Sequence, residues 1–279
     1  MKIVQAELFR LAHEKKYYLM LIGGVLLPIF QVIIFVVGVE YLQKIDPSML
    51  NMFRVNGYYE FGFFQLKEIK SLGGMALDEM LISVLGKNGI AVYISVLAAY
   101  YTAQYADNII RYLKIKRYSD SNIFFSMTFV LFLVTNLFFA VYFFAVLFFF
   151  GIILQVKGIA FSLTAKTGIF LVFLWLEMNF YVIFLMSVSL YSRRLASALL
   201  LDIIVVLSMG QALKFVELVI GKKGALQEYW ILSQIESIMT HNVDIADMFI
   251  FIMRSFCFAA ICFALNRIRI GRLGRETYY

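Results

Sequence analysis

The sequence contains few charged residues and very few prolines, cysteines and histidines. Only 15% of its 279 residues are charged, whereas a soluble domain carries about 25%. Two prolines and the lack of Ser-, Gln- or Glu-rich tracts exclude disordered and low-complexity chains, and 17 glycines without a period exclude collagen-like and repeat architectures. Because 62% of the residues are hydrophobic, the remaining class is an all-α integral membrane protein.

Histidine and cysteine are too rare to build a catalytic or metal centre. His13 lies near the amino terminus and His241 far along the chain, so neither a His-x-x-x-His metal site nor a Ser/His dyad is expected inside the membrane. Cys257 and Cys262 lie in one apolar run and suggest neither a disulfide framework nor a metal cluster. We therefore expect no metal site and no catalytic residue.

Nucleotide-binding and hydrolase motifs are missing as well. The Gly-Lys pairs at Gly86-Lys87 and Gly221-Lys222 do not end a Gly-x-x-x-x-Gly-Lys-Ser/Thr phosphate loop, and no Gly-x-Ser-x-Gly elbow occurs. The chain is thus expected not to be an enzyme. It is expected to bind no cofactor and not to hydrolyse ATP by the phosphate-loop route.

Long hydrophobic runs predict how often the chain crosses the bilayer. A spanning helix needs about 20 mostly apolar residues. The first such run is not followed by a small-residue cleavage pattern, so it is interpreted as an anchor helix rather than a signal peptide. A single transmembrane domain over 1–279 is predicted, with six spans at about 19–39, 88–106, 123–150, 169–191, 195–213 and 248–266. The third span lies in the uncharged run 121–156, which is longer than one span requires.

The distribution of Lys and Arg predicts the orientation of these spans. In the six-span arrangement, the side that carries both termini holds 14 Lys and Arg in 47 residues, and the other side holds 10 in 92. Because positive residues stay on the cytoplasmic side, both termini are predicted to be cytoplasmic. The net charge of +7 is then explained by topology, and no nucleic-acid partner is expected.

The amino-terminal segment 2–16 has the spacing of an amphipathic helix. Val4, Leu8 and Leu11 fall on one helical face, whereas Arg10 and the other charged residues lie largely elsewhere. A basic amphipathic helix that runs directly into a span is suited to lie in the membrane interface, in contact with lipid. The alternative is a solvated charged tail.

The connection between the second and third predicted spans, Asp107 to Arg117, is also a potential helix. Ile109, Ile110 and Leu113 lie close together in it, and basic residues surround them, namely Arg111, Lys114, Lys116 and Arg117. Such a segment could dock on a cytoplasmic protein partner or on anionic lipid, or could act only as a positive-inside anchor. The stretch Ser119-Asp120-Ser121 then supplies N-cap chemistry for the third span.

Three charged residues fall inside predicted spans, namely Glu177, Asp202 and Arg254. A charge at the bilayer centre costs about 2.5 to 3.5 kcal/mol on insertion scales, so these are candidates for a transport path. Asp202 and Arg254 lie close enough to a span end to snorkel. Glu177 lies near mid-span, where either a structural or a path role is open.

The two longest connections on the side away from the termini, 40–87 and 214–247, are charge-balanced and partly apolar. They carry aromatic residues such as Phe61 and Trp230. Aromatic residues of this kind most often belong to the membrane-interface belt. Both connections are predicted to form small interfacial helices.

The arrangement resembles the permease subunits of type-2 ATP-binding cassette exporters. The resemblance covers the whole chain and depends on three parts: the segment Ala6-Glu7-Leu8-Phe9-Arg10, six spans with both ends inside, and the stretch from Ala103 to Leu113 followed by Tyr118-Ser119. Ser119-Asp120 replaces the family's Ser-Arg turn, and Asp107 with Asn108-Ile109 replaces its usual Glu and Gly-Thr. The match therefore concerns layout more than individual residues.

This resemblance implies a second permease subunit, identical or related, and two copies of a separate ATPase that bind ATP and Mg²⁺. The ATPase would dock on the coupling helix, for which Asp107, Ile109, Ile110, Arg111, Leu113 and Lys114 are the candidate residues. The chain would lie in a bacterial plasma membrane, and short permeases of this kind resemble those that export, or protect from, antimicrobial peptides. An ATP-independent secondary transporter or channel remains an alternative, and a membrane-embedded enzyme a further one.

Overall fold

The computed structural model describes residues 2–45, 54–55, 58–61, 64–66, 68, 77–85, 89–104, 109–156, 165–192, 194–221, 226, 229–240 and 245–273. Helices dominate these residues. In chain order they are α1 (Lys2–Ala12), α2 (Lys15–Leu42), α4 (Leu77–Leu85), α5 (Gly89–Gln104), α6 (Ile110–Ile115), α7 (Asp120–Val156), α8 (Ala165–Ser192), α9 (Leu195–Ile220), α10 (Ile231–Thr240) and α11 (Ile245–Leu273). Three short strands, β1 (Arg54–Val55), β2 (Tyr58–Phe61) and β3 (Phe64–Leu66), precede α4.

Five helices, α2, α7, α8, α9 and α11, are long and apolar enough to cross a membrane. The chain is therefore a multi-pass membrane protein. The predicted span at 88–106 coincides with α5, whose 16 residues rise about 24 Å, less than the roughly 30 Å of a hydrocarbon core. Six spans are thus not confirmed. The uncharged run 121–156, in which the third span was predicted at about 123–150, lies within α7, a single helix of 37 residues.

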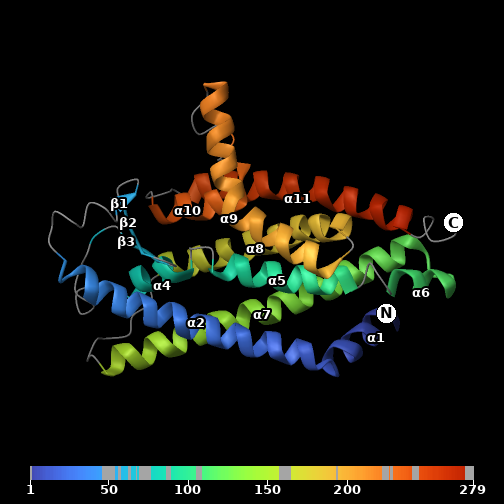
Figure 1. Ribbon diagram of the computed structural model, residues 1–279, viewed down its shortest axis with the longest axis horizontal. Helices are drawn as coiled ribbons and strands as arrows, with labels where there is room; N and C mark the ends of the chain where they lie inside the picture. The colour runs from blue at the N-terminus through green and yellow to red at the C-terminus, as the bar shows by residue number, and fades with distance from the viewer. Residues whose placement is uncertain are drawn as a thin grey trace.

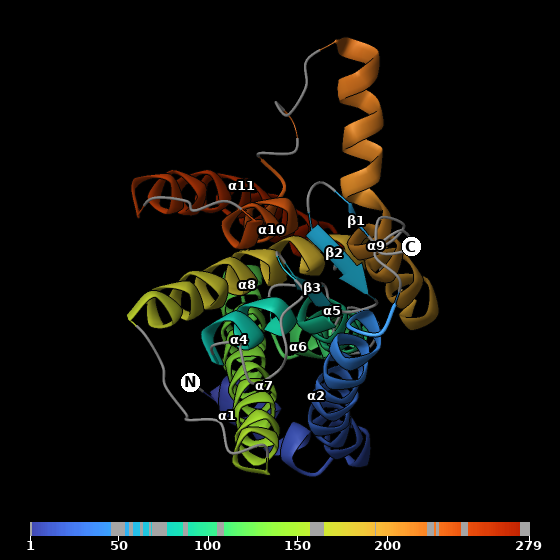
Figure 2. The ribbon, with the colours of Figure 1, turned by 90° about the vertical axis from the view of Figure 1, so that its left-hand side faces the viewer.

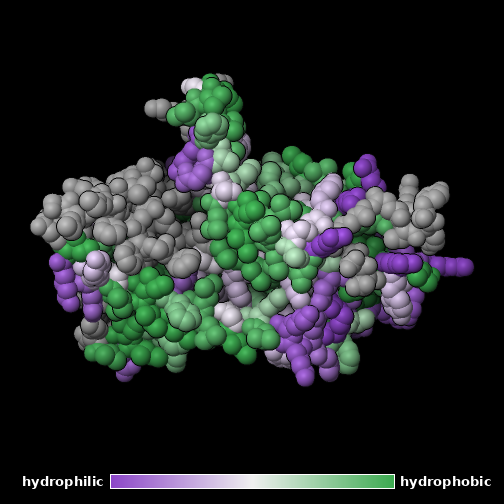
Figure 3. All heavy atoms as spheres, in the orientation of Figure 1, coloured by the Kyte–Doolittle hydropathy of each residue, from purple (hydrophilic) through white to green (hydrophobic). Residues whose placement is uncertain are grey.

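The long helices lie along the longest axis of the molecule in three layers, with α2 and α7 in one, α5 and α8 in the next, and α9 and α11 in the third (Figures 1 and 2). Helices α1 and α6 and the carboxyl end of α11 lie at one end of the bundle, here called the terminal end (Figure 1). The strands, α4 and α10 lie at the opposite end. Hydrophilic residues gather at the terminal end, and a hydrophobic surface covers much of the middle (Figure 3).

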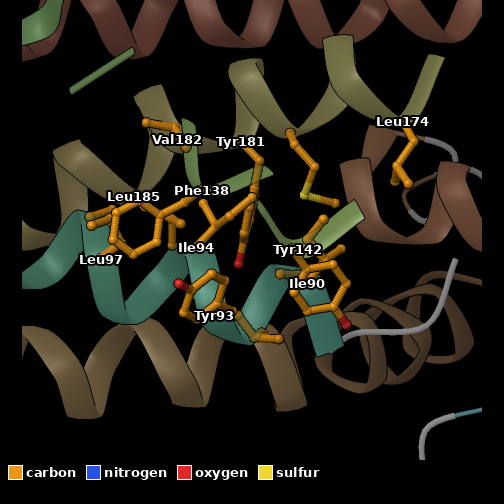
Figure 4. Packing of buried hydrophobic residues seen from close by; sticks show 14 of the residues in the cluster. Ile90, Tyr93, Ile94, Leu97, Phe138, Tyr142, Leu174, Tyr181, Val182 and Leu185 are labelled. Atoms are coloured by element: carbon orange, nitrogen blue, oxygen red, sulfur yellow. The ribbon is translucent and has the colours of Figure 1, made fainter. Parts of the chain in front are cut away.

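The centre of the bundle is filled by side chains of α5, α7 and α8 (Figure 4). Nearly every residue of α5 is buried. Its Tyr93 ring lies 5.4 Å from the ring of Phe138 and 6.0 Å from that of Tyr142, within the range of favourable aromatic pairs. Although α5 is short, it is the element around which the longer helices pack.

A glycine allows α2 to approach α5 closely. The Tyr93 hydroxyl donates a hydrogen bond to the backbone oxygen of Met20 at 2.7 Å. A Cβ atom on Gly24 would lie 2.1 Å from that hydroxyl oxygen, so a larger residue would displace the tyrosine. Small residues serve close helix contacts in membranes because the hydrophobic effect does not drive helices together there.

The prediction of small interfacial helices over 40–87 is wrong for the strand region. Strands β1, β2 and β3 form an antiparallel sheet in that order, with Val55 paired to Tyr58 and Phe61 paired to Phe64. The two residues between β1 and β2 in the sequence are Asn56-Gly57, the pair that two-residue hairpins favour. The helices α4 and α10 agree with the prediction for other parts of the two connections.

Helix α9 runs with the bundle from its first residue and then turns, so that its carboxyl-terminal part projects away from the other helices (Figure 2). Ser208 and Gly210 lie within this helix, and the Ser208 hydroxyl donates to the backbone oxygen of Ile204 at 2.6 Å. Neighbouring Ser and Gly residues and such back-bonding commonly bend helices. The helix ends at Gly221, whose φ of 74° is the left-handed conformation that glycine adopts readily.

Candidate functional site

The residues predicted to couple the chain to a partner lie in and around α6, at the terminal end. Asp107 lies outside the described residues. Ile109 is half-buried, whereas Ile110 and Leu113 are buried, with 1% and 7% of their surface exposed. The chain's own core covers these two aliphatic side chains, so in this structure they seat α6 on the bundle and do not offer a contact surface.

The outward face of α6 carries different residues. Arg111 and Lys116 are exposed, and Tyr112 and Ile115 expose 54% and 66% of their surface. The Lys116 ammonium lies 4.6 Å from the centre of the Tyr112 ring, a cation–π contact, and its hydrogen bond with Tyr112 raises the pKa of the Lys116 ammonium. A basic, partly apolar surface therefore faces outward.

The end of α6 is closed by a rigid turn. The amide of Tyr118 donates to the oxygen of Leu113 at 3.1 Å, and the amide of Arg117 donates to the oxygen of Lys114 at 2.9 Å. Together these two bonds form a Schellman motif. Arg117 occupies its left-handed position with φ of 61°, which is unfavourable by about 1 to 2 kcal/mol for a residue other than glycine. The surrounding structure keeps Arg117 in this unfavourable conformation.

Lys114 joins α6 to two long helices. Its ammonium lies 2.8 Å from Asp120 Oδ1, at the start of α7, and donates to the backbone oxygens of Ile270 and Gly271 in the last turn of α11 at 3.2 and 3.3 Å. A cation is favourable at a helix carboxyl end, where backbone oxygens lack intrahelical partners. Lys114 was predicted to take part in contact with an ATPase, but the structure gives it an internal role.

Within the predicted capping stretch Ser119-Asp120-Ser121, Ser119 is the residue that caps α7. The amide of Asn122 donates to the Ser119 hydroxyl at 3.3 Å, and the amide of Ile123 donates to the Ser119 backbone oxygen at 3.0 Å. The Schellman turn, the Lys114 contacts and this cap follow one another along the chain. They leave α6 fixed relative to α7 and α11.

Helix α1 packs on α7 through a face that differs in part from the predicted one. Leu11 is buried and Val4 partly buried, but Leu8 is exposed. Ile3 and Glu7, which precede Leu11 by eight and four residues, complete the buried face. The helix thus contacts the bundle on one side and presents an apolar surface outward on another.

Arg10 joins α1 to the end of α5. Its guanidinium donates to Glu7 Oε2 at 3.1 Å, to Glu14 Oε2 at 3.0 Å and to Gln104 Oε1 at 3.0 Å. Gln104 Nε2 donates to Glu14 Oε1 at 3.1 Å, and the Tyr100 hydroxyl donates to the same oxygen. The cluster connects the amino-terminal helix to the last turn of α5, the helix that precedes α6.

Two carboxyl groups in this cluster have shifted proton affinities. Burial raises the pKa of Glu7, and the Arg10 charge opposes that shift only in part. Burial also acts to raise the pKa of Glu14, but hydrogen bonds from Tyr100 and Gln104 and the charge of Arg10 outweigh it, so this pKa is lowered. Glu14 is therefore ionised at neutral pH.

Glu177 on α8 and Asp202 on α9 are both completely buried. Asp202 Oδ2 accepts a hydrogen bond from the Ser189 hydroxyl at 3.0 Å. Among the described residues, neither carboxyl oxygen of Glu177 nor Oδ1 of Asp202 has a hydrogen-bond partner. Both groups therefore lie inside the bundle, and Asp202 does not reach a membrane interface by snorkelling.

Arg254 differs from these two groups because it lies at the surface of α11. Its guanidinium carbon is 4.9 Å from the ring centre of Tyr229 and 6.0 Å from that of Phe251. It lines an apolar surface groove on α11. The three intramembrane charges are thus not brought together in one site.

The sequence interpretation missed two polar clusters. One is the contact of Arg10 and Glu14 with Gln104. The other lies between α7 and α8, where Asn136 Nδ2 donates to Asn179 Oδ1 at 3.1 Å and the indole of Trp175 donates to Asn136 Oδ1. The sequence signal for the second cluster was the presence of two polar residues, Asn136 and Asn179, within otherwise apolar spans. Polar side chains in such positions commonly join membrane helices.

The chain matches no protein-family model, no curated protein and no solved structure. The resemblance to type-2 exporters therefore remains an interpretation of the sequence. The function has to be inferred from the geometry of the terminal end and of the buried carboxyl groups.

Proposed function

We propose that the chain is the membrane-spanning permease subunit of an ATP-binding cassette exporter, with six spans that include α5. Both termini and α6 face the cytoplasm of a bacterial cell. A separate ATPase, present in two copies with a second permease subunit, binds ATP and Mg²⁺ and hydrolyses the nucleotide. The substrate is hydrophobic or amphipathic, in keeping with the apolar bundle, and a peptide of the antimicrobial class fits this description. The chain itself is not an enzyme.

The observation that carries this proposal is the way α6 is fixed. A force received from a partner is transmitted only by a rigid element, because a flexible loop absorbs it. Helix α6 is closed by the Arg117 turn and joined by Lys114 to Asp120 of α7 and to the last turn of α11. A displacement of α6 would therefore move two long helices with it.

The outward face of α6 supports an interaction with a protein partner. Tyr112 and Ile115 supply apolar surface, and Arg111 and Lys116 supply positive charge around it. Protein interfaces commonly have an apolar centre with a polar rim, and charges at the rim steer association. Burying one side chain of the size of Ile115 contributes roughly 1.5 to 3 kcal/mol.

The test is ATP hydrolysis by the complex purified from cells that also express a candidate ATP-binding cassette ATPase. Tyr112→Ala combined with Ile115→Ala removes roughly 3 kcal/mol of contact, which weakens binding on the order of a hundredfold. We expect co-purified ATPase and hydrolysis to fall together in this variant. Leu8→Ala, which removes exposed apolar surface from α1 at the same end, is the matched control. Equal hydrolysis in all three proteins would contradict the proposal.

A secondary transporter is the second candidate, and Glu177 favours it. A fully buried carboxyl group without a hydrogen-bond partner among the described residues suits a group that binds and releases a cation during transport. The discriminating measurement is substrate movement into liposomes that contain the purified chain alone under an imposed proton or sodium gradient. Movement that requires Glu177 would favour this candidate, and movement only with the ATPase and ATP would favour the exporter.

A further inference from the structure

Asp202 is a carboxyl group enclosed between three helices of the bundle. It belongs to α9, which packs on α5 and α8, and none of its surface is exposed. Its Oδ2 accepts a hydrogen bond from the Ser189 hydroxyl at 3.0 Å, whereas its Oδ1 has no hydrogen-bond partner among the described residues. One oxygen of the carboxyl group is thus enclosed without a polar contact.

The surroundings of Asp202 supply no positive charge. No cationic side chain of the described residues acts on it, and the titratable group of α8 that its charge reaches is the Tyr181 hydroxyl. From α5, Ala99 packs against Ala198, which lies one turn before Asp202 on α9. Helix α10 meets α9 at Gly210, eight residues or about 12 Å farther along the axis. A negative charge on Asp202 would therefore be buried without a counter-charge, which is strongly unfavourable.

Tyr181 is a second enclosed polar group beside Asp202. It points from α8 toward α5 (Figure 4), where its hydroxyl lies near that of Ser95 but has no hydrogen-bond partner among the described residues. The Ser95 hydroxyl donates to the backbone oxygen of Ala91 at 2.7 Å. A protonated carboxyl group is neutral and both donates and accepts hydrogen bonds, so it fits these neutral neighbours better than a carboxylate does.

The turn between α8 and α9 lies at the terminal end of the bundle. There the ring centre of Tyr191 lies 5.1 Å from the guanidinium carbon of Arg269, close to the carboxyl end of α11. Asp202 follows Leu195, the first residue of α9, by seven residues, or about 10 Å along the helix axis. The carboxyl group is therefore near the terminal end although it has no exposed surface.

A row of serine hydroxyls leads from Asp202 to that turn. Ser189, which donates to Asp202, precedes Ser192 by three residues on α8, and Cβ atoms at this spacing lie about 5 to 6 Å apart on one helix face. One water molecule suffices to bridge such a gap. The hydroxyls of Ser192 and Ser197 lie 2.6 Å apart, and both side chains are only half-buried. The row thus begins at the surface and ends at an enclosed carboxyl group.

From this geometry we propose that Asp202 is a proton-binding site that exchanges its proton with the solution at the terminal end along the hydroxyls of Ser189, Ser192 and Ser197. Each hydroxyl accepts a proton from one neighbour and releases its own to the next, so Asp202 gains or loses one proton and no other bond changes. The bound proton keeps the enclosed carboxyl group neutral. The proposal does not depend on the transport function.

The experiment is infrared spectroscopy of the purified full-length chain in liposomes at neutral pH. A protonated carboxyl group has a carbonyl band that differs from the bands of a carboxylate and shifts when deuterium replaces the proton. We expect a component of this band in the parent protein that Asp202→Asn lacks and that Glu177→Gln retains. Asp202→Glu, which keeps a carboxyl group, should restore the component. A band that Asp202→Asn leaves unchanged would show that Asp202 is ionised and would overturn the proposal.

Transfer of the same liposomes into heavy water measures the exchange route. Ser192→Ala combined with Ser197→Ala should slow the deuterium shift of the Asp202 component about tenfold, the factor that the loss of one hydrogen bond represents. Ser208→Ala removes an exposed hydroxyl farther along α9 and is the matched control, which should keep the parent rate. The parent rate in the double variant, or equal slowing in the double variant and the control, would overturn the proposal.

Discussion

Replacing Glu177 by leucine removes a carboxyl group that the bundle buries completely and leaves without a hydrogen-bond partner among the described residues. Burying an unpaired polar group costs about 1 to 3 kcal/mol in proteins. Leucine has a similar size and no such cost, so the free energy of unfolding should rise by roughly that amount. Glu177→Gln keeps a polar group in the same place and should leave the stability nearly unchanged.

The same substitutions should affect transport differently from stability. If the carboxyl group serves the path, both Glu177→Leu and Glu177→Gln lose substrate movement although the first is more stable and the second is folded normally. Such a loss of activity with a gain of stability is expected where a protein retains a destabilising group for function. A carboxyl group that served only in a structural ion pair would give neither the gain of stability nor the loss of transport.

The assay is reversible unfolding of the purified chain in mixed micelles, followed by transport in liposomes. Leu174→Ala, at a fully buried position one turn earlier on α8, is the packing control and should cost about 2 to 5 kcal/mol. A destabilisation of more than about 1 kcal/mol by Glu177→Leu would refute the reasoning, because it would mean that the carboxyl group has a stabilising partner. Full transport in both Glu177 variants would reject the path role.

Three further predictions concern residues at the terminal end. Leu113→Ala should destabilise the protein by about 2 to 5 kcal/mol because Leu113 is buried, whereas Ile115→Ala should change stability by less than about 0.5 kcal/mol, as measured by the same unfolding assay. Arg117→Gly should stabilise it by about 1 kcal/mol because glycine adopts the positive φ without strain, and an unchanged or lower stability would show that the Arg117 side chain contributes more than the strain costs. Because the pKa of Glu14 is lowered from 4.5, its contribution to stability is present above that value and is lost as the pH falls through the folded-state pKa; proteolysis of α1 should accelerate in that range, and Glu14→Gln should remove this pH dependence.

The long helices could be predicted from the sequence because each needs only a continuous apolar run of sufficient length. The uncharged run 121–156 gives α7, and the run after Lys16 gives α2. The central position of α5 could not be predicted, because an apolar run has the same composition whether lipid or protein surrounds it. The hairpin of β1 and β2 was missed although Asn56-Gly57 is a strong turn signal.

At the candidate site, the position of α6 along the chain could be predicted from the sequence, but not which of its faces packs on the bundle. Ile110 and Leu113 were expected to face a partner, and they face the bundle. Over six residues, periodicity shows that a helix has an apolar side and cannot show whether that side covers the same chain or another one. Lys114 was likewise expected outside, but its position beside the last turn of α11 depends on a contact between residues more than 150 positions apart, which local patterns do not reveal.

If α6 is the coupling helix, its outward face lies against the ATPase. A photoreactive amino acid incorporated at Ile115, in living cells that also express a candidate ATP-binding cassette ATPase, captures whatever protein contacts that position. The same photoreactive amino acid incorporated in place of Phe9, which is equally exposed on α1, is the control. We predict that Ile115 is cross-linked to a protein containing a phosphate-loop motif and that Phe9 is not; cross-linking of Ile115 only to lipid, or to another copy of this chain, would contradict the coupling role.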